Sequence, residues 1–315
     1  MSGAAGCVGV LLLVVGCAAA EPVAAPEATA RPISSPAGTA PPATAPPSTA
    51  SSAPSQALVT SPSPSDPAEQ SPTAPAPLPL PPPGWVLGAR PLPQNPDGSV
   101  PPQETPPELR DRRFPTLDLL PPPADGRFAA TIGAITADVR QRMGTTWSEG
   151  CPVPLGDLRY LTLGFWGFDD RPHTGELVVN AAVAEEVVDV FRELFDVRFP
   201  IEEMRLITTA DLEAAPTGDG NNTAAFVCRA ARGSTRFSEH AYGLAVDVNP
   251  FQNPYVRGEV VLPELARSYT DRARLRPGML AADHPAVAAF TRRGWEWGGS
   301  WRTVKDPMHF SARGG

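Results

Sequence analysis

Histidine and cysteine are both scarce in this sequence, with four of each among 315 residues. No two cysteines form a Cys-x-x-Cys pair, which argues against a metal site built on cysteine thiolates. Ser238 does not lie in a Gly-x-Ser-x-Gly motif, so nothing indicates a serine nucleophile of that kind. Basic residues are outnumbered by acidic ones, and the net charge of -8 argues against a nucleic-acid-binding protein.

Long hydrophobic runs are missing as well. The apolar stretch at residues 8–15 is too short to cross a bilayer as a helix and is typical of an export signal. The Lys or Arg that usually opens such a signal is absent from residues 1–10. Val14-Val15-Gly16-Cys17 resembles the lipobox of bacterial lipoproteins, which implies that Cys17 is acylated and becomes the first residue. The alternative is ordinary signal-peptidase cleavage after one of residues 18–20.

Proline divides the chain into parts of different composition, since 30 of its 41 prolines precede residue 124. After the signal segment 1–17, residues 18–83 are rich in Ala, Pro, Ser and Thr. They contain too few apolar side chains to offset the entropy of ordering, which predicts a disordered linker that holds a domain away from a membrane. Residues 84–126 form a Pro-rich transitional arm whose apolar side chains could dock on that domain. Residues 127–315 predict one globular domain with a sizeable core.

The pattern of apolar residues in this domain predicts helices mixed with short strands. We expect helices over residues 128–143, 181–195 and 285–293, and strands over residues 158–166, 176–180, 204–208, 242–248 and 308–311. Asn180 is a suitable N-cap for the second helix. The mixture predicts an α+β fold in which a small antiparallel sheet with flanking helices holds a zinc site.

Two of the four histidines stand in segments suited to a metal ion. Asp247 follows His240 by seven residues at the end of an apolar run, where a carboxylate is costly unless it is paired or bound to metal. His309 follows Asp306 by three residues, so that an acid can lie beside a ligand. Catalytic zinc sites use three protein ligands and one open position. His240, Asp247 and His309 can supply the three, and Asp306 the acid/base, although each short pattern alone is more often an ordinary surface or core feature.

The remaining histidines and cysteines have simpler interpretations. His173 precedes a strand and is either a surface-turn residue or part of a cleft wall. His284 opens a helix and is expected to be structural. Cys151 and Cys228 are the two cysteines left in an exported domain, which makes them a candidate disulfide.

Two longer segments resemble a known family. Residues 238–247 (SEHAYGLAVD) match the SxHxxGxAxD signature of the LAS-type zinc peptidases. Residues 294–301 (GWEWGGSW) and 306–310 (DPMHF) resemble the C-terminal block of its D-alanyl-D-alanine carboxypeptidase-like members. The family also contains D-Ala-D-Ala dipeptidases and L-alanyl-D-glutamate endolysins. The resemblance covers about residues 145–313.

The resemblance implies a Zn²⁺ ion bound by His240, Asp247 and His309, with Asp306 as the catalytic base. Dipeptidase members carry Glu in place of Asp306, so the sequence is closer to the endolysin-like branch and the scissile bond stays open.

An arginine upstream of the signature contacts the substrate in some members. Arg229 is our choice for that role, with Arg232 and Arg236 as alternatives. Ser238 is implied as a further substrate contact.

The expected activity is therefore zinc-dependent hydrolysis of peptidoglycan stem peptides, by D-Ala-D-Ala carboxypeptidase action. The alternatives are an endopeptidase of the L-Ala-D-Glu type and a non-catalytic wall-binding lipoprotein. We expect an extracytoplasmic monomer, anchored through Cys17 to the bacterial cell membrane and facing the cell wall, with no nucleic-acid partner.

Overall fold

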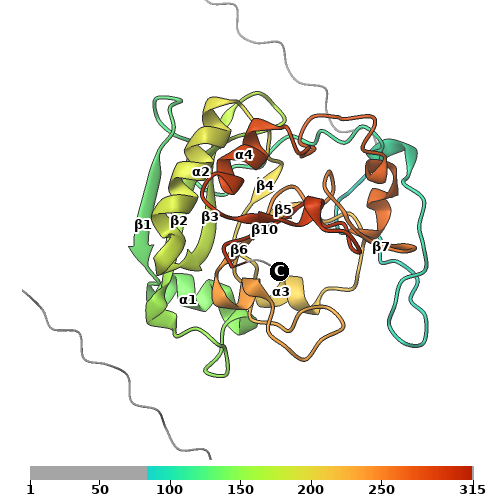
Figure 1. Ribbon diagram of the computed structural model, residues 1–315, viewed down its shortest axis with the longest axis horizontal. Coiled ribbons are helices and arrows are strands. Elements are labelled where there is room, and N and C mark those ends of the chain that lie inside the picture. Colours follow the sequence, from blue (N-terminus) through green and yellow to red (C-terminus); the bar gives the residue numbers. More distant parts are fainter. Residues whose placement is uncertain (1–83, 314–315) are drawn as a thin grey trace, which may run out of the picture. The chain divides into compact units, whose positions relative to one another are not determined.

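The computed structural model describes residues 84–313, so the predictions for the signal segment, Cys17 and the linker 18–83 lie outside the described residues. One layer of the domain is a three-stranded antiparallel sheet in the order β1-β2-β3 (Figure 1). Its strands are β1 (Ala130–Ala134), β2 (Leu158–Trp166) and β3 (Pro172–Asn180). Mixed helices and small antiparallel sheets confirm the predicted α+β class.

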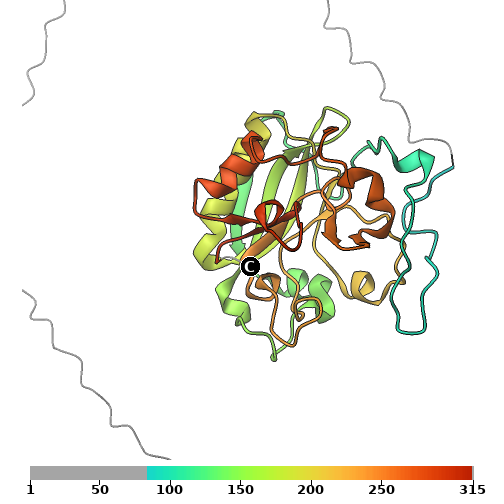
Figure 2. The same ribbon diagram turned by 45° about the vertical axis from the view of Figure 1, so that its right-hand side comes forward.

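Helix α2 (Ala184–Asp196) covers one face of this sheet, and α4 (Pro285–Thr291) lies beside it (Figures 1 and 2). Asn180 starts the turn into the helix as predicted, because its side chain accepts a hydrogen bond from the Ala182 amide at 3.0 Å. The apolar stripe of α2 includes Val187, Phe191 and Leu194, all buried in the main core. Burial of each such side chain contributes about 1.5–3 kcal/mol, which fixes the helix on the sheet.

A second antiparallel sheet has the order β6-β10-β9. Its strands are β6 (Ala245–Asp247), β9 (Glu296–Trp297) and β10 (His309–Ser311). Phe310 in the central strand is fully buried and stacks on Phe290 of α4, with ring centroids 3.9 Å apart. This sheet, which carries the predicted metal ligands, is therefore anchored to the main core.

Shorter elements complete the described chain. Two further pairs of strands are parallel β4 (Glu203–Met204) with β5 (Asn222–Thr223) and antiparallel β7 (Tyr255–Arg257) with β8 (Val260–Leu262). The short α-helices are α1 (Ala137–Met143) and α3 (Thr209–Glu213), and the 3-10 helices are η1 (Pro107–Leu109), η2 (Gly144–Thr146), η3 (Leu155–Asp157), η4 (Ala181–Val183), η5 (Glu239–Tyr242), η6 (Glu264–Thr270) and η7 (Gly298–Ser300). Among residues 84–313, no helix has both the length and the apolar character to span a membrane.

The arm, residues 84–126, packs on the domain. Figure 2 shows the arm running along the domain. Trp85, Leu109 and Phe114 are buried in a second apolar cluster with side chains of η6. Arg112 is buried and forms an ion pair with Glu202, with 2.5 Å between Nη2 and Oε1. Apolar and ionic contacts together therefore hold the arm in place, despite its many prolines.

Three of the predicted elements are wrong in part. The first half of the expected helix 128–143 is strand β1, and the helix begins only after Thr136, whose side chain caps α1 by accepting from the Val139 amide. The expected strand 204–208 shrinks to β4, and the expected strand 242–248 shrinks to β6 because Tyr242 lies in η5.

His173 is neither on the surface nor in a cleft wall. It is buried between two carboxylates, with Asp118 of the arm 2.7 Å from Nδ1 and Asp169 2.9 Å from Nε2. His284 is structural as expected, because its Nδ1 accepts from the Ala286 amide at the start of α4.

Candidate active site

The loop that carries His240 is shaped by the residues on either side of it. Ser238 is the N-cap of η5, and its Oγ accepts a hydrogen bond from the His240 amide at 3.4 Å. Gly243 ends η5 with a φ of 68°, and a Cβ atom there would lie 2.6 Å from the Asn180 amide nitrogen. Only glycine fits this turn without strain, and the turn leads directly into β6 and Asp247.

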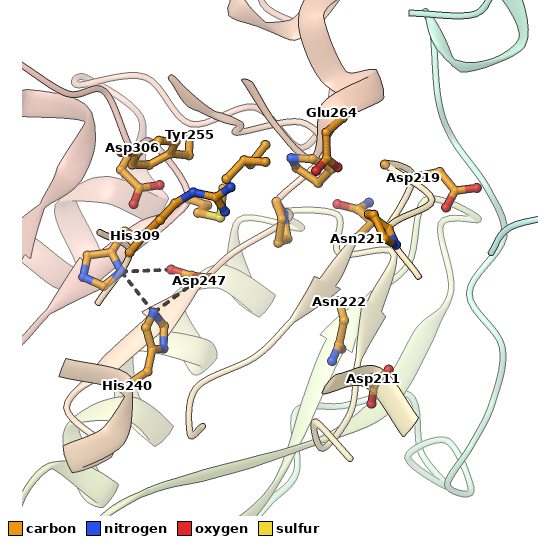
Figure 3. A pocket seen from close by; sticks show the side chains of 18 of the residues that line it. Asp211, Asp219, Asn221, Asn222, His240, Asp247, Tyr255, Glu264, Asp306 and His309 are labelled. Carbon is orange, nitrogen blue, oxygen red and sulfur yellow. Dashed lines mark hydrogen bonds and ion pairs between the residues drawn. The ribbon is translucent and has the colours of Figure 1, made fainter. Parts of the chain in front are cut away.

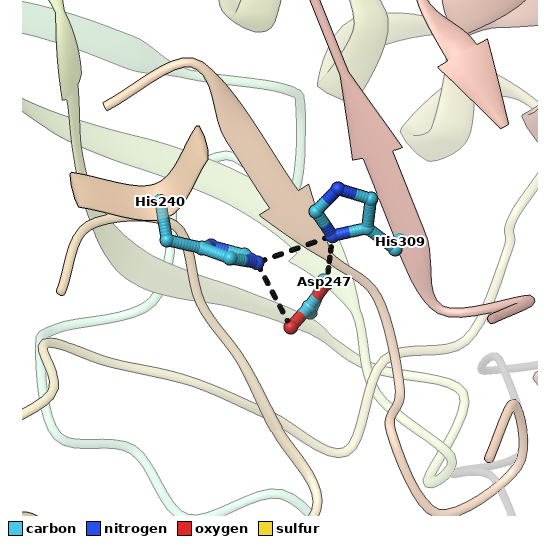
Figure 4. Close-up of side chains that lie close together, drawn as sticks. All are labelled: His240, Asp247 and His309. Atoms are coloured by element: carbon cyan, nitrogen blue, oxygen red, sulfur yellow. Dashed lines mark hydrogen bonds and ion pairs between the residues drawn. The ribbon is translucent and has the colours of Figure 1, made fainter. Parts of the chain in front are cut away.

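His240, Asp247 and His309 converge as predicted (Figure 4). Nε2 of His240 lies 3.2 Å from Oδ2 of Asp247 and 3.2 Å from Nδ1 of His309, and that Nδ1 lies 3.0 Å from Oδ1 of Asp247. Ligand atoms about 2.0–2.1 Å from a tetrahedral zinc ion stand about 3.3 Å apart. The three side chains therefore offer two imidazole nitrogens and a carboxylate at a spacing that fits such an ion.

The ring of His240 is oriented by the backbone. Its Nδ1 donates to the carbonyl oxygen of Ala225 at 2.5 Å, which leaves Nε2 free to face the cluster. Such a partner on the second nitrogen is typical of metal-binding histidines. Burial lowers the pKa of the His240 imidazole. The negative charge of Asp247 and the hydrogen bonds of His240 to Asp247 and to the Ala225 carbonyl raise it, and their effect is the larger one, so the pKa is raised overall.

Asp247 is held in its ionised form. Burial raises the pKa of this carboxyl, but the charge and hydrogen bond of His240, together with those of His309, lower it far below its ordinary value. The cluster thus places an ionised carboxylate beside two imidazole nitrogens, a donor set that a divalent cation can use.

Asp306 lies beside the cluster, and its side chain points into the same pocket (Figure 3). Its backbone is held close to η7, where the Asp306 amide donates to the Gly298 carbonyl at 3.1 Å and a Cβ on Gly298 would lie 2.5 Å from the Asp306 carbonyl oxygen. Oδ1 of Asp306 is buried and has no hydrogen-bond partner among the described residues. Burial and the charge of Asp247 raise the pKa of Asp306 to about 7, against the lowering effect of His309 and Arg229.

Arg229, Arg232 and Arg236 all line this pocket from the loop before η5. The positive charge of Arg229 lowers the pKa of both His240 and Asp306. A disulfide joins Cys228, the residue before Arg229, to Cys151, with 5.8 Å between the Cα atoms. This bond ties the start of the arginine loop to the segment between η2 and η3.

The pocket is a long groove of about 2350 Å³ that runs from the candidate metal ligands to the arm (Figure 3). Trp301 lines it next to the cluster, with its ring centroid 5.5 Å from that of His309. Apolar arm residues, including Leu87 and Leu117, line it farther away. Ligand pockets for small molecules commonly measure about 300–1,000 Å³, so this groove has room for a longer chain.

Some groove residues received no role from the sequence. Tyr255 lies next to Asp306 in the groove (Figure 3), and Arg257 lines it as well. The Ala225 carbonyl that orients His240 was also missed. No local pattern signals such residues, because they reach the site through the pairing of short strands and loops.

Comparison with known proteins gives one match. Residues 232–312, about a quarter of the chain, match a family model described as D-alanyl-D-alanine carboxypeptidase. No curated protein and no solved structure matches the chain. The matched segment contains His240, Asp247, Asp306 and His309, so the resemblance to this peptidase family, drawn from the sequence motifs, is confirmed for the part of the chain that forms the cluster.

Proposed function

We propose that the domain is a zinc-dependent peptidase that hydrolyses peptidoglycan stem peptides, with D-Ala-D-Ala carboxypeptidase action. The observation that carries the proposal is the arrangement of His240, Asp247 and His309 around one point, with Asp306 buried beside them in a groove. Two imidazoles and one carboxylate form a donor set that suits zinc and leaves one position for catalysis.

His240, Asp247 and His309 would hold the ion. Zinc supplies Lewis-acid chemistry and makes water a nucleophile near neutral pH. The protein residues then have their own tasks. The Ala225 carbonyl keeps Nε2 of His240 directed toward the ligand position, and Asp247 stays ionised between the two imidazoles.

Asp306 is the proton carrier in this proposal. Its carboxylate takes one proton from the attacking water as the new C–O bond forms, and it passes that proton to the leaving nitrogen as the C–N bond breaks. A base with a pKa near the working pH is suited to both steps, and burial keeps the pKa of Asp306 in that range. Arg229 would stabilise negative charge on the substrate, and Ser238 would contact the bound peptide.

A wall-binding protein without activity is the alternative from another class. Such a protein has no need of a buried carboxyl with an unpaired oxygen beside a metal site. Burying that oxygen without a partner lowers stability, and proteins usually keep such a group only where it takes part in catalysis. Endopeptidase action is the alternative within the same chemistry, and the length of the groove is the feature that favours it.

We further propose that the protein is exported and lipid-anchored through Cys17, which would place the groove next to the cell wall. Cys17→Ala is then expected to move the protein from the membrane fraction to the soluble fraction. A wild-type protein that is already soluble would contradict the anchor.

The enzymatic proposal is tested with the purified full chain. Zinc content is measured by elemental analysis, and purified muropeptides are incubated with the protein and followed by mass spectrometry. We expect about one zinc per chain and the loss of one D-Ala from pentapeptide stems. Release of larger fragments would indicate an endopeptidase, and binding without any new product would indicate the non-catalytic alternative.

A further inference from the structure

Strand β7 pairs with the segment that carries Asp306. Val256 of β7 and Lys305 exchange both backbone hydrogen bonds, with N–O distances of 2.7 and 3.0 Å. In this antiparallel register Tyr255 is opposite Asp306, and Arg257 is opposite Val304. Side chains of directly opposite residues lie on the same face of a pair of strands.

The face that these residues share is the groove. Tyr255, Arg257, Val304 and Asp306 all line it, whereas Val256 and Lys305, the paired residues between them, do not. This alternation is what a strand with one face toward the groove requires. Figure 3 shows the Tyr255 side chain beside that of Asp306. β7 therefore adds a phenol and a guanidinium to the groove on the Asp306 side.

Neither group is committed elsewhere in the described part of the chain. Arg257 has no hydrogen bond or ion pair through its side chain there, and the hydroxyl of Tyr255 has no partner there either. Arg257 is exposed and Tyr255 is half-buried, so both remain accessible to a ligand. Guanidinium and phenol are both hydrogen-bond donors, and a carboxylate accepts from both.

The role of Asp306 determines on which side of the cleaved bond Tyr255 and Arg257 lie, and this step rests on the proposed function. A carboxyl that protonates the leaving nitrogen must lie on the leaving-group side of the scissile bond. Its neighbours on the same face then contact the residue that is released. We propose that Tyr255 and Arg257 bind the free α-carboxylate of that released residue. The groove would then select peptides in which the released residue is the last one.

This carboxylate site is separate from the arginine loop on which Arg229 lies. It gives the protein a means of distinguishing a chain end from an internal bond, because a continuing chain has an amide and no charge at that point. Opposite an uncharged amide, half-buried Tyr255 and exposed Arg257 lose their charge-assisted hydrogen bonds, which together change affinity by about tenfold.

The test uses the zinc-loaded full chain and two synthetic acyl-peptides that end in D-Ala-D-Ala, one with a free carboxylate and one with a C-terminal amide. We expect wild type to prefer the free acid in kcat/KM by at least about tenfold. Arg257→Gln should reduce this preference about tenfold, mainly through KM, with little change on the amide. Tyr255→Phe should reduce it less, and Arg257→Lys should restore part of it because the charge is kept and the planar fork is lost.

Matched controls separate the site from general effects. Arg274→Gln removes another exposed arginine that does not line the groove, and it should leave the preference unchanged. Zinc content and thermal unfolding midpoints should be the same in all variants. A wild-type protein that cuts both peptides equally, or a preference that survives Arg257→Gln, would overturn the carboxylate site and leave the peptidase proposal standing. Absence of any turnover of either peptide would remove both.

Discussion

Asp247 and His309 face each other across the antiparallel strands β6 and β10, with Oδ1 of Asp247 3.0 Å from Nδ1 of His309. The two residues are 62 positions apart in the sequence, and the register of two three-residue strands brings them together. The central strand is fixed in turn by Phe310, which packs on α4. Core packing thus determines the spacing of these two candidate metal ligands.

Removal of a ligand tests this directly. His309→Ala should lose most of the bound zinc and all detectable turnover, because two remaining donors hold the ion weakly. Elemental analysis after dialysis measures the loss. His284→Ala is the matched control, since that imidazole caps α4 and packs on Phe199, outside the cluster, and we expect full zinc content with a loss of about 1 kcal/mol in stability. Zinc at one per chain in the His309 variant would show that the site is elsewhere.

The cluster of His240, Asp247 and His309 could be predicted because these residues lie in short segments with recognisable residue types at fixed spacing. Strand β2 and helix α2 could be predicted for a similar reason, since their apolar periodicity extends over nine residues or more, whereas only residues 176–180 of β3 were expected as strand. The helix expected over residues 128–143 was wrong in its first half, which forms strand β1. Gly133 and the β-branched Thr131 and Ile132 disfavour a helix there, and Thr136 is an N-cap within the expected helix.

Contacts between distant segments could not be predicted. The buried pair of Arg112 with Glu202 joins residues 90 positions apart, and neither has a neighbouring sequence pattern that indicates burial. His173 is a similar case, because one of its two carboxylate partners comes from the arm. Such groups are positioned by tertiary packing. A contact between residues far apart in the chain leaves no local periodicity or motif from which it could be predicted.

The disulfide offers a stability prediction. Cys151 and Cys228 are separated by 77 residues, and closing a loop of that length stabilises the folded state by about 4 kcal/mol in the chain-entropy model. A variant with serine at both positions should lose much of this stability in urea unfolding. Its KM should also rise, because Cys228 immediately precedes Arg229. Addition of a reductant should destabilise wild type and leave the double variant unchanged, and equal sensitivity of both would argue against the bond.

The arm is expected to depend on one buried ion pair. Arg112 and Glu202 are 1% and 5% exposed, and Arg112 also donates to the Asp219 carbonyl at 2.7 Å. Arg112→Ala leaves the Glu202 carboxylate buried without its counter-charge, which commonly costs about 3–5 kcal/mol. Thermal unfolding measures the change. Arg127→Ala, in an exposed pair with Asp125, is the control and should leave the midpoint nearly unchanged.

Asp211 gives the protein a pH-dependent contribution to stability. Burial raises its pKa, but hydrogen bonds from Arg205 and Thr208 and the charge of Arg205 lower it below the ordinary value of 3.8. A group with a lowered folded-state pKa stabilises the protein above its unfolded pKa, and this contribution disappears as the pH falls through the folded pKa. Asp211→Asn should therefore be less stable than wild type by about 1 kcal/mol or less at pH 7, given its partial exposure. The difference should shrink below pH 3.8 in urea unfolding; a constant difference across this range would contradict the assignment.

Asp306→Asn separates the proton carrier from the metal ligands. Asparagine keeps the shape of the side chain and loses the ability to take a proton, so that zinc content and folding should match wild type. Turnover should fall by about 10²–10⁴-fold, the usual contribution of a positioned acid/base. If the Asp306 side chain instead only supports its neighbour His309, zinc affinity and activity should fall together by about 10–100-fold. Zinc content and turnover measured on the same sample decide between the two, because a variant that is fully loaded and nearly inactive is consistent only with a role in proton transfer.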